Sequence, residues 1–141
     1  MTPADHSSHC MCPEGDIKSG GSPNGFVLHI PNLNARIYHG GDTNVFTDMG
    51  LIDELWQPNI ILIPIGDRFT MGPKGAALAC RKFFPSAKHI VPMHYGTFPL
   101  LTGTFEAFEE ELKKQGVDLG RLFKTPTAKD GAGWQVDLAT L

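Results

Sequence analysis

The sequence of 141 residues lacks several features that mark particular classes of protein. It has no stripe of lysine and arginine, and its formal net charge is −3, so we do not expect a nucleic acid as partner. No apolar run approaches the ~18 residues that a membrane helix needs. Residues 1–5 lack the basic and apolar regions of a signal peptide. We therefore expect a cytoplasmic protein without a membrane partner.

Cysteine is scarce: the three cysteines are an odd number and do not form a disulfide framework. A reducing cytosol is the simplest compartment for such a chain. Cys10 and Cys12 follow His9, and thiolates bind Zn²⁺ and Cu(I). However, the spacing is Cys-x-Cys and no second pair exists, because Cys80 stands alone. We interpret the cluster as an incidental part of a loop, with a metal site as the less favoured alternative.

Two familiar catalytic signatures are also missing. The chain has no Gly-x-Ser-x-Gly turn for a serine nucleophile and no glycine-rich phosphate-binding loop. What it does have is a core-forming composition, since 41% of its residues are hydrophobic, in a length suited to a single domain over residues 1–141.

Strand and helix patterns alternate along the chain, which predicts a layered α/β domain. The patterns predict a β-hairpin at 25–39 with a turn at 31–34, further strands at 59–65 and 88–92, short strands near 122–124 and 134–136, and helices at 47–57, 74–84 and 105–115. Residues 1–24 are polar, and we expect a loop without regular structure, either functional or disordered.

Asp42 is the centre of the candidate site. It follows a predicted strand and the pair Gly40-Gly41, and two glycines in a row allow a sharp turn. In open α/β sheets, ligands bind outside the carboxyl ends of the strands. Asp42 is therefore placed either for chemistry and metal binding or, as the simpler alternative, as the N-cap of the next helix.

Two histidines favour the metal interpretation. His94 also follows an apolar run and precedes a glycine, and His6 lies in a polar loop. Two imidazoles and a carboxylate from separate loops suit a Zn²⁺-type ion. The alternatives remain a structural role for His94 and a solvated one for His6.

Another strand-end loop, residues 66–73, is expected at the same crevice. Its Asp67, Arg68 and Thr70 either orient a substrate or only lead into the next helix. His39, beside the Gly40-Gly41 turn, is a candidate neighbour of the metal ligands.

Several motifs together resemble a known family. They are ADHSS at 4–8, YHGGDT at 38–43, LIPIGD at 62–67, FTMGP at 69–73 and PMHYGTFP at 92–99. They resemble the metal-dependent hydrolase branch of the metallo-β-lactamase superfamily that is related to L-ascorbate-6-phosphate lactonase. The resemblance spans residues 2–125, in order.

The resemblance implies a role for each site residue. His6 would bind a first metal ion, Asp42 would bridge two ions and His94 would complete the second. Asp67, Thr70 and Tyr95 would line the catalytic site. Metal-bound hydroxide would attack a lactone, an ester or a phosphoester, because a metal ion lowers the pKa of bound water to roughly 7. Zinc is the expected divalent metal, with manganese or iron as alternatives.

One family motif, His-x-His-x-Asp-His, does not occur in the sequence. The chain thus resembles the carboxy-terminal half of an αββα sandwich, with one mixed sheet and helices on one face. We expect weak metal binding, an incomplete and inactive enzyme, and a homodimer or larger oligomer through the uncovered apolar sheet face. The alternative is a non-catalytic truncated half-domain that acts only as an oligomerising or interaction module.

Overall fold

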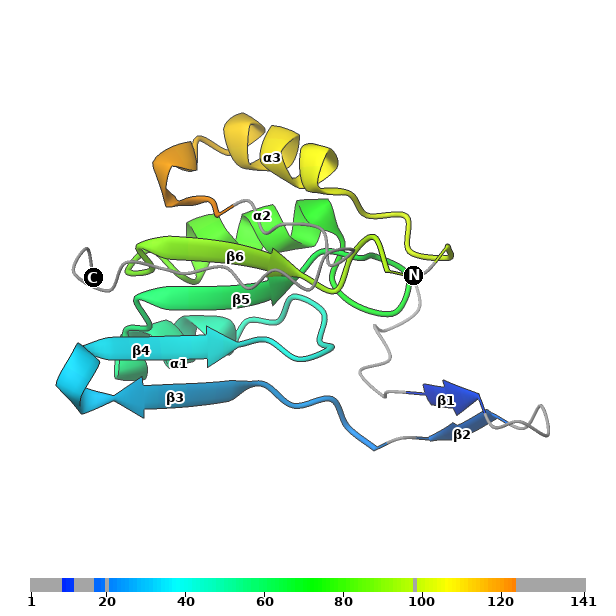
Figure 1. The fold of residues 1–141 in the computed structure, drawn as a ribbon, viewed down its shortest axis with the longest axis horizontal. Coiled ribbons are helices and arrows are strands. Elements are labelled where there is room, and N and C mark those ends of the chain that lie inside the picture. The colour runs from blue at the N-terminus through cyan, green and yellow to red at the C-terminus, as the bar shows by residue number, and fades with distance from the viewer. Residues whose placement is uncertain (1–8, 12–16, 20, 98, 124–141) are drawn as a thin grey trace.

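A mixed β-sheet organises the computed structural model, which describes residues 9–11, 17–19, 21–97 and 99–123 (Figure 1). Its strands follow the order β3-β4-β5-β6, with β3 antiparallel to β4 and the other neighbours parallel. The strands are β3 (Phe26–Ile30), β4 (Ala35–His39), β5 (Ile60–Pro64) and β6 (His89–Met93). This architecture confirms the predicted α/β class with one mixed sheet.

Helices line one face of this sheet. They are α1 (Met49–Trp56), α2 (Pro73–Lys82) and α3 (Phe105–Lys114), with short 3₁₀ turns at Pro31–Leu33 and Leu119–Arg121. Figure 1 shows α1 and α2 behind the sheet and α3 beside α2. The Thr104 side chain accepts a hydrogen bond from the Ala107 amide and caps α3, which begins where the sequence predicts the third helix.

The core lies between the sheet and the helices. Val27, Tyr38, Ile61 and Ile90 stand in register across the four strands and pack into the same hydrophobic cluster. The Tyr38 ring stacks on Phe84 with centroids 4.9 Å apart. Because side chains alternate along a strand, the neighbours of these residues point to the opposite face.

The opposite face carries no helix within the described residues. On β3 it presents Phe26, Leu28 and Ile30, which are 62%, 49% and 38% exposed. In the described sheet β3 is also an edge strand. On the same face, Ile60 of β5 and Val91 of β6 are buried. The uncovered apolar surface that the sequence predicts is therefore found on β3 and not across the whole sheet.

Some predictions about the chain ends differ from the structure. Within 1–24, β1 (His9–Met11) and β2 (Ile17–Ser19) pair as antiparallel strands, so the prediction of no regular structure there is wrong for these residues. Near 122–124 the structure has an isolated parallel bridge between Leu122 and Ile90 in place of a strand. The strand predicted at 134–136 lies outside the described residues. Within the described ranges, no helix combines the length and apolar character needed to cross a membrane.

Candidate metal centre

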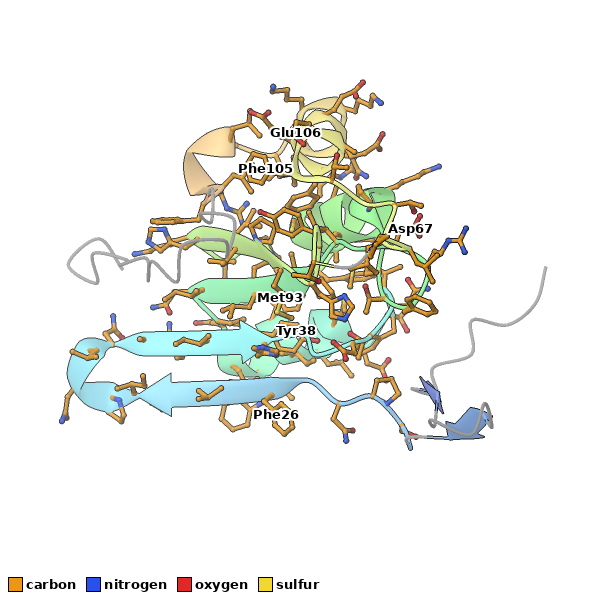
Figure 2. All side chains as sticks on the ribbon, turned by 45° about the vertical axis from the view of Figure 1, so that its right-hand side comes forward. Phe26, Tyr38, Asp67, Met93, Phe105 and Glu106 are labelled. Carbon is orange, nitrogen blue, oxygen red and sulfur yellow. The ribbon has the colours of Figure 1, made fainter. Side chains whose placement is uncertain are left out.

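The candidate site lies where three strands end. Since β4, β5 and β6 are parallel, their carboxyl ends meet at one edge of the sheet, where Figure 2 places Asp67. Glycines let the loops approach closely at this edge. A Cβ on Gly66 would lie 2.1 Å from the His94 carbonyl oxygen, and one on Gly103 would lie 1.8 Å from that of Ile65. The loops after β5 and β6 therefore pack backbone against backbone.

Gly41 makes the turn that presents Asp42. Its φ is +62°, a conformation that L side chains rarely adopt, so the predicted sharp turn is confirmed. The Gly41 amide donates to His39 Nδ1 at 3.1 Å, and the Thr43 hydroxyl donates to the Gly40 carbonyl oxygen at 2.8 Å. His39 is thus part of the turn itself. The alternative of Asp42 as a helix N-cap is wrong, because α1 begins later and its N-cap is Asp48.

Asp42 and His94 come together across this edge. The distance between Asp42 Oδ1 and His94 Nε2 is 3.8 Å, and both side chains remain partly exposed. His94 has a φ of +56°. For a non-glycine residue this is a sparsely populated conformation, and such residues cluster at functional sites. The backbone thus holds the imidazole in an unusual position that faces the carboxylate.

The donor pair fits a metal ion. Two ligands of one tetrahedral zinc ion, each about 2.1 Å from it, lie about 3.4 Å apart. The observed separation of 3.8 Å needs only a small adjustment to reach that value. Within the described ranges no group of three or more His, Cys, Asp or Glu side chains gathers around an ion-sized space. His6, the third ligand that the sequence suggests, lies outside the described residues.

The loop after β5 is held by its own backbone. Asp67 and Arg68 have φ values of +65° and +57°, and the Asp67 amide donates to the Met71 carbonyl oxygen at 3.1 Å. The Met71 amide in turn donates to the Thr43 carbonyl oxygen at 3.0 Å, which ties this loop to the turn of Asp42. The two strand-end loops therefore form one connected structure.

The remaining candidate residues differ in exposure. Asp67 is exposed, and its Oδ2 accepts a hydrogen bond from the Thr102 hydroxyl at 2.9 Å. Thr70 is buried, whereas Tyr95 is half-buried with its ring centroid 6.5 Å from that of Phe105. No local pattern points to Thr102 as part of the site, because its partner Asp67 lies 35 positions away in the chain. Its hydroxyl fixes the direction of the Asp67 carboxylate.

The family of the chain follows from comparison with known proteins. The model of the beta-lactamase superfamily domain matches residues 1–95, a range that includes Asp42 and His94. The chain therefore belongs to the beta-lactamase superfamily, as the motifs predicted.

The similar proteins that carry names are metal-dependent hydrolases. A metal-dependent hydrolase of Mesorhizobium japonicum is 54% identical over 97 residues, which are 69% of this chain and 40% of that protein. A metal-dependent hydrolase of Rubrobacter xylanophilus is 47% identical over 118 residues, which are 84% of this chain and 48% of that protein. The solved structure of a metallo hydrolase from Ignicoccus hospitalis has a TM-score of 0.61 and 30% identity, over 88% of this chain and 47% of that one. The chain spans somewhat less than half the length of these relatives.

Proposed function

We propose that the chain contributes metal ligands to a hydrolase, with Asp42 and His94 binding a divalent ion and His6 as a further ligand. The observation that carries the proposal is the 3.8 Å separation of Asp42 Oδ1 and His94 Nε2 at the carboxyl edge of the sheet. Relatives that are named metal-dependent hydrolases support it. Zinc suits a set of imidazole and carboxylate ligands, with manganese and iron as the alternatives.

The other residues have roles around this pair. When bound by Asp42 and His94, a divalent ion would supply a water molecule of lowered pKa and would polarise the group under attack. Asp67, oriented by Thr102, would accept a hydrogen bond from the substrate or from water. Tyr95 would contact the substrate through its ring or hydroxyl, and Thr70 would shape the floor of the loop. A lactone, an ester or a phosphoester is the proposed substrate class.

Metal binding by this chain alone should be weak. The ligand motif His-x-His-x-Asp-His, which the family resemblance leads us to expect, is absent from the 141 residues. With fewer ligands, the ion is held less tightly and hydrolysis by the isolated chain should be slow or absent. Incompleteness is thus part of the proposal.

Turnover in the presence of zinc or manganese tests the proposal. The purified chain would be assayed with an aryl ester, a lactone and an aryl phosphodiester, beside the variants Asp42→Asn and His94→Asn. Asparagine tolerates the positive φ of position 94 better than most residues do. Glu54→Gln, an exposed change on α1, is the matched control.

We expect at most slow turnover of one substrate class, and any such turnover should be lost in both site variants and kept in the control. Equal turnover in Asp42→Asn and the unchanged chain would contradict the assigned role of Asp42. If no substrate is turned over while metal still binds, the proposal is confined to metal binding.

We also propose that two copies of the chain associate through the exposed apolar residues of β3. Phe26, Leu28 and Ile30 expose a contiguous apolar row on the edge strand β3, and edge strands readily pair with other chains. Analytical ultracentrifugation should give a dimer or larger species that Leu28→Lys dissociates. Leu55→Lys, at an exposed leucine on α1, should leave it intact. A monomer at micromolar concentration would exclude this association.

A further inference from the structure

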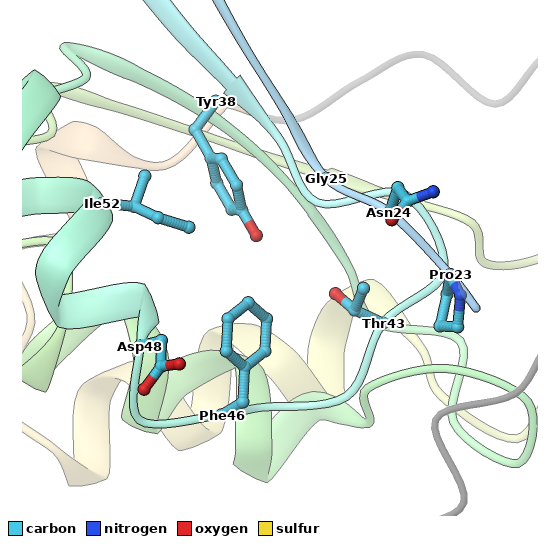
Figure 3. A pocket seen from close by; sticks show the side chains of 8 residues that line it. All are labelled: Pro23, Asn24, Gly25, Tyr38, Thr43, Phe46, Asp48 and Ile52. Carbon is cyan, nitrogen blue, oxygen red and sulfur yellow. The ribbon is translucent and has the colours of Figure 1, made fainter.

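A concavity lies on the helix side of β4, away from the sheet face that carries Phe26, Leu28 and Ile30. It is formed between the segment before β3, the loop that follows Asp42 and the start of α1 (Figure 3). Its volume is about 460 Å³, within the range of small-molecule sites. The lining residues are Pro23, Asn24, Gly25, Tyr38, Thr43, Phe46, Asp48 and Ile52.

The floor of this pocket is rigid. Tyr38 is 1% exposed and its ring is fixed by stacking on Phe84. A Cβ on Gly25 would lie 3.0 Å from the Tyr38 hydroxyl, so a side chain at this position would crowd the hydroxyl. Burial raises the pKa of Tyr38 to about 12, although the neighbouring Thr43 hydroxyl acts in the opposite direction. The phenol is therefore neutral at physiological pH.

The walls combine apolar surface with one negative charge. The Phe46 ring and the Ile52 side chain border the open space on the α1 side, and the Asp48 carboxylate stands beside them (Figure 3). Asp48 is the N-cap residue of α1, but its carboxylate makes no capping hydrogen bond and instead accepts one from the neighbouring Thr47 hydroxyl at 3.3 Å. None of the eight lining residues is Lys, Arg or His. The carboxylate thus has no cationic partner among the residues that form the pocket.

We propose that this pocket binds a small organic ammonium compound, with its apolar body between Phe46 and Ile52 and its charged group at Asp48. Aromatic faces attract cations, and an exposed carboxylate adds a direct ion pair. The site is distinct from the Asp42–His94 pair. The two are adjacent in the chain because Thr43, which lines the pocket, directly follows Asp42.

The test is an amide NMR titration of the full chain with 2-phenylethylamine. The matched probe is 3-phenylpropionate, which keeps the aromatic body and reverses the charge. We expect saturable shifts for the amine at Phe46 and Ile52 and weaker binding of the acid. Asp48→Asn should raise the Kd of the amine about two- to fivefold, the size of an exposed ion pair. Glu54→Gln, which removes a charge on α1 outside the pocket, should leave the Kd unchanged.

Three results would overturn the proposal. The first is equal affinity for the amine and the acid. The second is the absence of saturable shifts at Phe46 and Ile52. The third is a set of shifts centred on Asp42 and His94, which would place the amine at the other carboxylate. Because Asp48 is exposed, Asp48→Asn should fold normally, and its unperturbed spectrum checks this.

Discussion

Replacing Gly41 by alanine tests whether the turn that presents Asp42 depends on glycine. The φ of +62° is unfavourable for alanine by about 1–2 kcal/mol. In addition, the new Cβ would lie 2.2 Å from the Asn24 carbonyl oxygen, which is backbone and has little freedom to move. Forced overpacking of this kind costs about 1–3 kcal/mol. The sum is about 2–5 kcal/mol.

Gly116→Ala is the matched control. Gly116 has a φ of +71°, but a Cβ there would have no heavy atom within 4 Å. Alanine at this position should therefore cost only the conformational part, about 1–2 kcal/mol. The loss of freedom in the unfolded chain is the same for both variants and cancels in the comparison.

Thermal unfolding followed by circular dichroism measures the difference. For a chain of this size, 1 kcal/mol shifts Tm by about 4 °C. We expect Tm to fall by about 8–20 °C in Gly41→Ala and by about 4–8 °C in Gly116→Ala. Equal falls in the two variants would refute the close contact between Gly41 and the Asn24 carbonyl.

Two further predictions concern buried groups on the helix side. Burial raises the pKa of the Asp53 carboxyl group above its ordinary 3.8, although the hydrogen bond from Ser86 acts in the opposite direction. The folded state therefore holds the carboxyl proton more tightly than the unfolded state does. The free energy of unfolding should then decrease as the pH rises above 3.8. Urea unfolding across the acidic and neutral range should show this decrease in the natural chain and not in Asp53→Asn; parallel curves would contradict it. Burial also raises the pKa of the Cys80 thiol to about 12 and makes its side chain inaccessible to solvent. In a variant whose other two cysteines are replaced (Cys10→Ser and Cys12→Ser), a thiol reagent should therefore label Cys80 only after the chain unfolds. Rapid labelling of Cys80 in the folded protein would contradict this prediction, because it would show that the reagent reaches the buried side of α2 without global unfolding.

Local patterns predicted most of the fold. The strand predicted at 59–65, the turn at 31–34 and the helix at 105–115 each reflect interactions within a few residues, and the structure confirms all three. The sequence did not predict the paired strands β1 and β2, because each is only three residues long and lies in a polar segment. Leu122 bridges to Ile90, a contact that no local pattern encodes.

For the candidate site, the sequence predicted which residues follow the ends of strands, but not which of their side chains come into contact. The sequence placed Asp42 and His94 after separate strands, and the parallel arrangement of β4, β5 and β6 brings them together. The sequence did not show whether Asp42 is a metal ligand or the N-cap of a helix, since aspartate suits both roles. The hydrogen bond from Thr102 to Asp67 depends on how two loops meet, which is decided by backbone contacts at glycines far apart in the sequence.

The metal content of the purified chain is the most direct test of the central claim, that Asp42, His94 and His6 hold a divalent ion. The natural chain and the variants Asp42→Asn, His94→Asn and His6→Asn would be dialysed against micromolar zinc and analysed by mass spectrometry. Thermal unfolding of the metal-free samples would confirm that each variant folds. We predict that the natural chain retains zinc and that each variant retains less at unchanged stability. Equal zinc content in all four proteins would contradict the account.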